Sequence, residues 1–414
     1  MKVLQQALPV LLRGISTRSM VCPWSIDTES CEMSFRATKV FYFVTIMAIA
    51  GMHKTLWADP QSEARHLLSS WVESNRAPGV QYIIADSQRI IFEYNTGFAD
   101  VDAKRPVTSK TTFNGYSITK TFTAAAVVKL AMEGKVDLDT PIKKYLPDLP
   151  YNGSPTVRQT LQHTAGFPNP NPLPWIHLVA HHGDFDEQTF IRRIFVNNPE
   201  LKFEPGSKFS YSNVGYLALG QLVATVSGRS FEDYVMQEII NPLALTKQQT
   251  ISFRLDRPQE HAYGYIRKWH WLNFFLGFFI DRQTYLASAT GGWTRFNHLM
   301  VNGKAYGGLV GNSAGFVRYL QAILRREGPF SEQVVQSLWQ VGSTNTNQPI
   351  RTGLSWFHGI LDGKRYFMHS GGAGGYYCEM RIYPDINRVS IIMTNNTGIS
   401  SQGYLDTVDR FFLK

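Results

Sequence analysis

The stretch Ser117-Ile118-Thr119-Lys120 follows the loop Phe113-Asn114-Gly115-Tyr116 and opens an apolar helix predicted over 121–133. A serine hydroxyl is a poor nucleophile near neutral pH and needs a base within hydrogen-bond reach. Residues three apart on a helix share a face, so this spacing places the amine of Lys120 beside the hydroxyl of Ser117. The helix N-terminus also offers free N–H groups and a positive dipole end, which favour developing negative charge. The stretch therefore predicts a nucleophilic serine at the start of a helix.

The rest of the chain divides into two β-rich ends and a mainly helical middle. Segments 79–84 and 89–94 are predicted to form a hairpin, and Pro and Gly punctuate helical signals from about residue 135 to 290. Helices are expected at 156–162, 188–196, 214–226, 231–240, 314–326 and 404–412, and strands at 353–360, 366–369, 376–383 and 389–394. This pattern predicts an α+β fold, an αβα sandwich. An antiparallel sheet from both chain ends is covered by helices, a mainly helical subdomain is inserted, and the site lies in a cleft between them.

Two further motifs place polar groups where they can serve a site. Tyr211-Ser212-Asn213 lies just before a predicted helix. A tyrosine acts as a general acid or base when cationic neighbours lower its pKa, and an asparagine amide can bind a substrate amide. The alternative is an Asn near a helix N-cap beside a packed Tyr. His369-Ser370-Gly371-Gly372 closes the strand predicted at 366–369. Its glycines let a ligand approach the backbone, with a Gly-rich turn as the alternative.

Together the three motifs resemble those of the serine β-lactamase and penicillin-binding-protein superfamily, in which Ser-x-x-Lys is accompanied by Ser-Asp-Asn and Lys-Thr-Gly. Tyr-Ser-Asn in the middle position resembles the class C branch and its relatives. Further segments resemble family segments in the family's order: 96–100 (TGFAD), 138–141 (LDTP), 144–147 (KYLP), 161–166 (LQHTAG) and 307–309 (GGL). The resemblance covers about residues 63–412. It implies a β-lactamase/transpeptidase-like fold, which we expect to occupy 59–414.

The resemblance also implies acyl transfer without a metal or a cofactor. Ser117 would attack a carbonyl and form an acyl-enzyme, with Lys120 and Tyr211 handling the proton. The backbone N–H groups of Ser117 and Gly372 would form the oxyanion hole. Asn213 would orient the substrate amide or the Lys120 ammonium, and water would release the acyl group. The residues expected to bind substrate are Asn213, His369, Ser370, Gly371 and Gly372.

The third motif departs from the β-lactamase pattern, because His369 stands where Lys-Thr-Gly has its lysine. Lysine is cationic near neutral pH, whereas histidine titrates near about pH 6.5. That lysine helps to bind a substrate carboxylate and to keep the tyrosine acidic, so its replacement argues against strong β-lactam hydrolysis. We predict a serine hydrolase of ester or amide bonds in a small molecule or peptide. The alternatives are a class C-like β-lactamase or D,D-peptidase, and a non-catalytic penicillin-recognition or scaffolding protein.

Residues 1–58 have the features of a targeting segment. The apolar run 40–52 (VFYFVTIMAIAGM) follows Arg36 and Lys39, and it has the length of a signal-peptide core rather than of a bilayer span. Ala48-Ile49-Ala50 has the small-x-small form of a cleavage site. A start at Met33 would account for the residues before this run. We expect export to the periplasm or the medium, with a membrane anchor or an organelle presequence in residues 1–20 as alternatives.

The charge of the chain does not favour nucleic-acid binding. The formal net charge is +9, from 41 basic and 32 acidic residues; without residues 1–58 the counts are 35 and 29, or +6. Surfaces that bind the phosphate backbone of nucleic acids are rich in clustered Lys and Arg, and the sequence lacks dense runs of these residues. We therefore expect no nucleic-acid partner.

Of Cys22, Cys31 and Cys378, only Cys378 lies in the body of the chain, so no disulfide is expected within it.

A histidine cluster, His177, His181 and His182 with Asp184, suggests metal binding. The chain has no His-Glu-x-x-His motif, and a proline before and a glycine after the cluster limit any helix there. We therefore expect no metal site.

The segment 269–280 (WHWLNFFLGFFI) is unusually aromatic and too short to span a membrane. It is interpreted first as buried core beneath the site. The alternatives are a hydrophobic wall for an acyl substrate and an interfacial contact with lipid. A second expectation is therefore that the protein associates with a membrane, through this segment or through the N-terminal segment.

Overall fold

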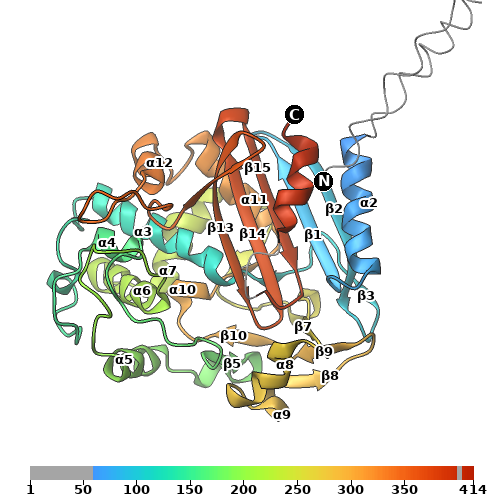
Figure 1. The fold of residues 1–414 in the computed structure, drawn as a ribbon, viewed down its shortest axis with the longest axis horizontal. Coiled ribbons are helices and arrows are strands. Elements are labelled where there is room, and N and C mark those ends of the chain that lie inside the picture. The colour runs from blue at the N-terminus through green and yellow to red at the C-terminus, as the bar shows by residue number, and fades with distance from the viewer. Residues whose placement is uncertain (1–58, 399–402) are drawn as a thin grey trace, which may run out of the picture. The chain divides into compact units, whose positions relative to one another are not determined.

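A seven-stranded sheet in the order β12-β13-β14-β15-β1-β2-β3 forms the centre of the computed structural model, and all its neighbouring strands pair antiparallel. Strands from opposite ends of the chain meet in its middle, where Val80 of β1 pairs with Thr394 of β15. The predicted hairpin and the sheet made from both chain ends are confirmed (Figure 1). The strands of this sheet are β1 (Gly79–Ala85), β2 (Ile90–Asp100), β3 (Arg105–Pro106), β12 (Phe357–Leu361), β13 (Lys364–Ala373), β14 (Tyr376–Tyr383) and β15 (Arg388–Thr394).

The structure describes residues 59–398 and 403–414, which belong to one unit, Asp59–Lys414. The targeting run, the start at Met33, Cys22 and Cys31 lie outside the described residues. Cys378 is a free, buried thiol. In the part of the chain that is described, no helix is both long enough and apolar enough to cross a bilayer.

Helices cover both faces of the large sheet. On one face lie α2 (Pro60–Glu73) and α13 (Tyr404–Val408), which pack together through the rings of Trp71 and Tyr404 at a centroid distance of 4.8 Å (Figure 1). On the other face, α11 (Ser313–Arg325) contacts β1 and β15. The αβα sandwich expected from the sequence is thereby confirmed. Helix α2 was not predicted, although Asp59 caps it and Pro60 occupies its first turn.

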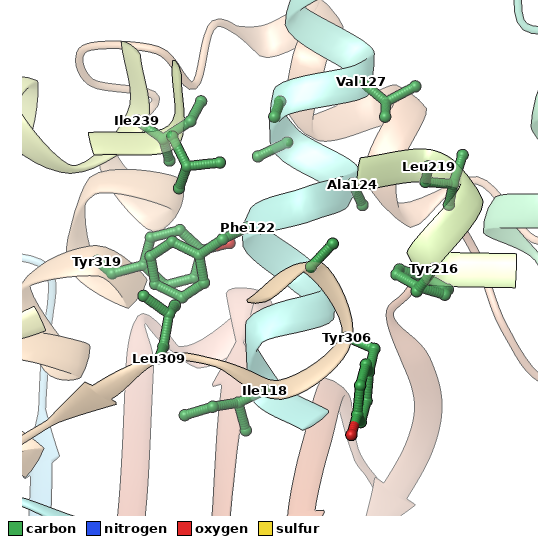
Figure 2. Packing of buried hydrophobic residues seen from close by; sticks show 14 of the residues in the cluster. Ile118, Phe122, Ala124, Val127, Tyr216, Leu219, Ile239, Tyr306, Leu309 and Tyr319 are labelled. Atoms are coloured by element: carbon green, nitrogen blue, oxygen red, sulfur yellow. The ribbon is translucent and has the colours of Figure 1, made fainter. Parts of the chain in front are cut away.

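Helix α3 (Thr119–Met132) lies at the centre of the helical part of the fold. It is apolar on nearly every side, which is the pattern of a helix surrounded by protein. Phe122 stacks on Tyr319 of α11 at 3.8 Å, and Tyr216 and Tyr306 flank the N-terminal half of the helix (Figure 2). The remaining helices are α4 (Val157–Leu161), α5 (Glu187–Asn197), α6 (Asn213–Ser227), α7 (Phe231–Val235), α8 (Trp271–Phe275), α9 (Arg282–Tyr285), α10 (Lys304–Gly307) and α12 (Glu332–Trp339).

The middle of the chain contains more β-structure than the sequence predicted. Besides the large sheet, the described residues form three small sheets, each of two or three strands. These strands are two to four residues long, too short for an alternating pattern to show, and several of them pair with distant segments, as β5 does with β10. They are β4 (Phe113–Asn114), β5 (Ile176–Leu178), β6 (Ile251–Ser252), β7 (Gly264–Arg267), β8 (Leu286–Ser288), β9 (Trp293–Phe296), β10 (Leu299–Val301) and β11 (Val310–Gly311).

Three predicted boundaries need correction where they touch the site. The helix after the Ser-x-x-Lys motif begins at Thr119 rather than at residue 121, and it follows a 3₁₀ turn, Tyr116–Ile118. The strand expected at 353–360 is β12, at Phe357–Leu361, because Gly353 N–H donates to Trp356 O and closes a turn there. Strand β13 does not end at His369 but continues to Ala373, since its pairing with β14 extends that far.

Candidate active site

Ser117 lies in the 3₁₀ turn that leads into α3, and the residue before it has an unusual backbone. Tyr116 has φ +45°, a left-handed conformation that side chains larger than glycine adopt at a cost of about 1–3 kcal/mol. The Tyr116 hydroxyl donates to Gly374 O at 2.6 Å and its ring is buried. These contacts hold the turn and present Ser117 at the surface of a cavity.

Lys120 is fully buried on α3, and its amine contacts three oxygens. Nζ lies 3.1 Å from Ser117 Oγ, 2.9 Å from Asn213 Oδ1 and 2.7 Å from Tyr306 O. Burial holds the pKa of the Lys120 amine well below its ordinary value. In the neutral amine, the two N–H groups can donate to Asn213 Oδ1 and Tyr306 O, which turns the lone pair toward the Ser117 hydroxyl.

The Tyr211 hydroxyl donates to Ser117 Oγ at 2.9 Å. Burial raises the pKa of Tyr211 above its ordinary value, which is opposite to the lowering by cationic neighbours that general acid–base catalysis by a tyrosine would require. The cation in question is Lys120, whose Nζ lies 5.0 Å from the centre of the Tyr211 ring but whose own pKa is depressed by burial. Tyr211 therefore acts as a neutral hydrogen-bond donor to the serine.

Asn213 is the first residue of α6, and Ser212, not Asn213, is the N-cap, since Ser212 Oγ accepts from Gly215 N. This leaves the Asn213 amide free to face Lys120, to which it is bonded through Oδ1. Its backbone N–H donates to Asn169 Oδ1 at 3.0 Å. Of the two roles predicted for Asn213, the geometry corresponds to holding the Lys120 amine.

The third motif lies along β13, directly beside the Ser117 turn. A Cβ atom on Gly371 would lie 2.2 Å from Gly115 O and 2.9 Å from Ser117 N, so only glycine fits there. Gly372 lines the same cavity as Ser117. His369 and Ser370 do not line that cavity.

His369 is buried, and Nδ1 donates to Ser370 O at 2.8 Å. Its ring packs edge-on against Phe357 at 5.4 Å. Burial lowers the pKa of His369 to about 3, with the nearby Lys120 acting in the same direction. The imidazole is therefore neutral near pH 7 and does not supply the positive charge that a lysine would carry in this position.

Two residues that sequence reasoning did not assign also shape the site. The ring of His163 lies 4.4 Å from that of Tyr211 and 5.0 Å from that of Tyr216, and its Nδ1 accepts from Ser212 N. His163 thus fixes the loop that carries Tyr211. The only feature of the sequence that pointed to His163 is its place in the family-like segment 161–166 (LQHTAG). Tyr306 contributes its carbonyl oxygen, which no sequence pattern reveals, because every residue has one.

The site opens into a cavity of about 150 Å³ that has polar groups at one end and an apolar wall at the other. Ser117, Tyr211, Asn213 and Gly372 line the polar end. The apolar wall is formed by Leu173, Ile176, Leu276, Ile280, Phe296 and Leu299.

The aromatic segment 269–280 therefore contributes to the wall through Leu276 and Ile280. Its interpretation as buried core is right for these two residues and for Leu272 but wrong for the aromatic rings, because the segment turns only one helical face inward. The rings exposed to solvent are those of Trp269, Trp271, Phe274, Phe275, Phe278 and Phe279.

The histidine cluster of the sequence is only partly assembled. His177 Nε2 lies 2.8 Å from His182 Nδ1 with the rings stacked, and His177 Nδ1 bonds to Asn302 Oδ1. His181 and Asp184 are exposed. Within residues 59–398 and 403–414, no group of three or more such side chains is placed to hold a metal ion.

A serine held between a buried lysine and a tyrosine, in the turn that leads into the central helix of an αβα sandwich, defines the class of serine hydrolases that comprises β-lactamases and penicillin-binding proteins. The beta-lactamase family model matches residues 64–411, and the chain belongs to this family. The superfamily inferred from the three motifs is thereby confirmed, and it supports a serine hydrolase in general.

Similar proteins agree with this assignment. The chain is 26% identical over 323 residues to penicillin-binding protein 4* of Bacillus subtilis (strain 168), covering 76% of this chain and 67% of that protein. It is 27% identical over 193 residues to protein flp of Staphylococcus aureus (strain NCTC 8325 / PS 47), covering 45% of this chain and only 38% of that protein.

Two solved structures share the fold. The octameric penicillin-binding protein homologue from Pyrococcus abyssi has a TM-score of 0.66 at 21% identity and covers 84% of this chain and 76% of its own. D-amino acid amidase from Ochrobactrum anthropi SV3 in complex with D-phenylalanine has a TM-score of 0.67 at 20% identity, with 86% and 97% covered. At these identities, the likeness confirms the β-lactamase/transpeptidase-like fold.

Proposed function

We propose that this protein is a serine hydrolase that cleaves an ester or amide bond through an acyl-enzyme on Ser117. The observation that carries the proposal is the environment of Lys120. Its amine is fully buried and bonded to Asn213 Oδ1 and Tyr306 O, and it lies 3.1 Å from Ser117 Oγ. A neutral amine in that position is a general base for the serine hydroxyl.

Acylation would begin when Ser117 Oγ attacks the substrate carbonyl and its proton passes to Lys120 Nζ. The resulting ammonium is stabilised by the oxygens of Asn213 and Tyr306 that already face it. The Tyr211 hydroxyl, 2.9 Å from Ser117 Oγ, then protonates the leaving group and regains its proton from Lys120. Water hydrolyses the acyl-enzyme by the reverse sequence of proton transfers.

Backbone donors would stabilise the tetrahedral intermediate. Ser117 lies in the first turn before α3, where N–H groups are not consumed by the helix, and Gly372 lines the cavity opposite it. Their N–H groups are the donors that we assign to the oxyanion hole. Loss of one such donor typically costs about 10²–10³ in rate.

The cavity favours an apolar acyl group over a β-lactam as the substrate. Its wall is formed by aliphatic and aromatic side chains, and the neutral His369 offers no charge for a substrate carboxylate. The second candidate is β-lactam acylation or D,D-peptidase activity, which the similarity to penicillin-binding protein 4* favours. We place it second because of His369.

One set of assays tests both candidates. The purified protein is incubated with a fluorophosphonate probe, a p-nitrophenyl ester series and a chromogenic cephalosporin, alongside Ser117→Ala. We expect labelling at Ser117 and ester turnover that rises with acyl chain length; Ser117→Ala should lose the labelling and reduce turnover by about 10³-fold or more. Absence of labelling would contradict the enzyme proposal, and rapid cephalosporin turnover would reverse the order of the candidates.

A further inference from the structure

The segment of chain between β7 and β8 contains α8 and the 3₁₀ turn Leu276–Phe278 that follows it (Figure 1), and it exposes six aromatic rings to solvent. Trp269, Phe274 and Phe278 are 80–90% exposed. The rings also contact one another, at centroid distances of 5.6 Å for Phe274–Phe275 and 6.1 Å for Phe275–Phe278. Isolated exposed apolar residues are ordinary on proteins, but a contiguous patch marks a contact site. The aromatic surface consists of Trp269, Trp271, Phe274, Phe275, Phe278 and Phe279.

The segment is apolar on both of its faces. Leu272, Leu276 and Ile280, at a helical spacing of four, are buried and pack in a common core cluster. Apart from Gly277 and the buried Asn273, the positions between them carry exposed rings instead of the polar residues that normally cover the outer face of a surface helix. The inner face is thus satisfied by the fold, while the outer face has no partner in residues 59–398 and 403–414.

The charges around the aromatic surface indicate what kind of partner it fits. Residues 267–282 contain the cations Arg267, Lys268 and Arg282 and a single acid, Asp281. All four are exposed, and Lys268 Nζ lies 5.9 Å from the centre of the Trp269 ring. Tryptophan beside cations is the composition of segments that lie at the boundary between lipid headgroups and acyl chains.

We propose that the aromatic surface docks onto a lipid bilayer, with its rings in the headgroup–acyl boundary and its flanking cations among anionic headgroups. A second copy of this chain fits the surface less well. A symmetric contact would join two copies of a patch flanked by Arg267, Lys268 and Arg282 and by a single acid, and an excess of like charge around an interface opposes association.

The aromatic surface is continuous with the candidate active site. Leu276 and Ile280, which belong to the same segment as the exposed rings, line the wall of the Ser117 cavity. Docking would therefore bring this wall to the membrane and give a lipid-borne acyl chain a short path to the serine. This last step rests on the proposed function, whereas the docking itself does not.

Vesicle binding tests the docking directly, with the full chain and phosphatidylcholine vesicles prepared with and without phosphatidylglycerol. The test variant is Trp269→Ser/Phe274→Ser/Phe278→Ser. The control is Val196→Ser/Ile360→Ser, which removes apolar side chains that are 65% and 73% exposed on α5 and β12. We expect the partition coefficient of the test variant to fall by about tenfold or more and that of the control to stay unchanged. Any binding by residues 1–58 adds the same contribution to all three chains, so the aromatic surface is judged by the difference between the test variant and the control.

Fluorescence quenching and activity measurements distinguish membrane docking from misfolding and from self-association. Vesicles with brominated acyl chains should quench the fluorescence of the unmodified chain more than that of Trp269→Phe. Both serine variants should keep fluorophosphonate labelling and short-ester turnover, which also shows that they are folded. Equal partitioning of the test variant would overturn the docking, as would self-association that this variant abolishes without any vesicle binding. A chain that binds vesicles but labels no serine would instead contradict the proposed function.

Discussion

At Lys120, burial favours the neutral amine, because it holds the pKa well below that of a free lysine. Because the pKa of the amine is lowered, the basic form is present above that pKa and is lost as pH falls through it. The acid limb of kcat/KM against pH should report this titration. His369, whose pKa is about 3, should not contribute to it between pH 5 and 8.

Lys120→Arg therefore makes a sharp test, because a guanidinium stays charged at all relevant pH values and cannot accept the serine proton. We expect kcat/KM to fall by about 10²-fold or more and no alkaline pH to restore it. Lys129→Arg is the control, since Lys129 lies on the same helix but forms an ion pair with Glu133. A Lys120→Arg enzyme with an ordinary pH profile would show that Lys120 is not the base.

The residues of the site differ in how far sequence could reveal them. Ser117, Lys120 and Tyr211 were predicted, because a hydroxyl, an amine and a phenol at motif spacing specify chemistry by residue type. The structure brings these three together, and their catalytic roles stay predictions. The Tyr306 carbonyl could not be predicted, because a backbone acceptor leaves no trace in residue identity. The directions in which the pKa values of Tyr211 and His369 shift could not be predicted from the sequence either, since burial sets them.

Among the elements, strand β13 sets how closely the third motif approaches the nucleophile. Its Gly371 lies where a Cβ atom would meet the Gly115 carbonyl oxygen and Ser117 N. In Gly371→Ala the strand or the Ser117 turn has to shift, which displaces the Gly372 N–H from the reacting carbonyl.

We expect Gly371→Ala to reduce kcat/KM by about 10²-fold, because displacements near 1 Å have effects of that size. Gly183→Ala serves as the control, since a Cβ atom there would meet nothing within 4 Å and Gly183 lies outside the site. Steady-state ester kinetics provide the measurement. Ordinary kinetics for Gly371→Ala would mean that the strand and the turn are not in close contact in solution.

Long elements were predicted better than short ones. Helix 214–226 was placed within one residue of α6, because its apolar run and the Ser212 cap both mark its start. Strands such as β6, of two residues, carry too few positions for a period to show, and their existence depends on tertiary pairing. The first interpretation of 269–280 as core is right for Leu272, Leu276 and Ile280 but wrong for its rings, since composition alone does not say which face of a helix is covered.

At the scale of the whole molecule, one buried carboxylate ties the chain ends to the sheet. Asp409, after α13, accepts hydrogen bonds from Tyr82 of β1, Tyr383 of β14 and Ser390 of β15, each 2.7–2.8 Å long. Burial raises the pKa of Asp409 to about 6, against the lowering effect of Arg381 and of the three hydroxyl donors.

A raised carboxyl pKa means that the folded protein binds this proton more tightly than the unfolded chain does. The stabilisation is fully present below the unfolded pKa of about 3.9 and is lost as pH rises through about 6. The free energy of unfolding of the unmodified protein minus that of Asp409→Asn should therefore fall by roughly 2 kcal/mol between pH 4 and pH 7. Urea unfolding at several pH values provides the measurement.

Asp385→Asn is the matched control, because Asp385 lies at the surface in an exposed pair with Arg365 and its removal should leave the pH dependence nearly unchanged. If the difference in the free energy of unfolding between the unmodified protein and Asp409→Asn is constant or increases with pH, the Asp409 carboxylate is ionised throughout this pH range.

The pairing of β1 with β15 has a consequence for the order of events during synthesis. Thr394 is made 314 residues after its partner Val80. The large sheet cannot close in its middle until β15 has been made, and such long-range pairing is slow to form. The nascent chain therefore carries β1 and β2 as a hairpin with an unpaired strand edge while those residues are added, and an edge of this kind is prone to pair with other chains.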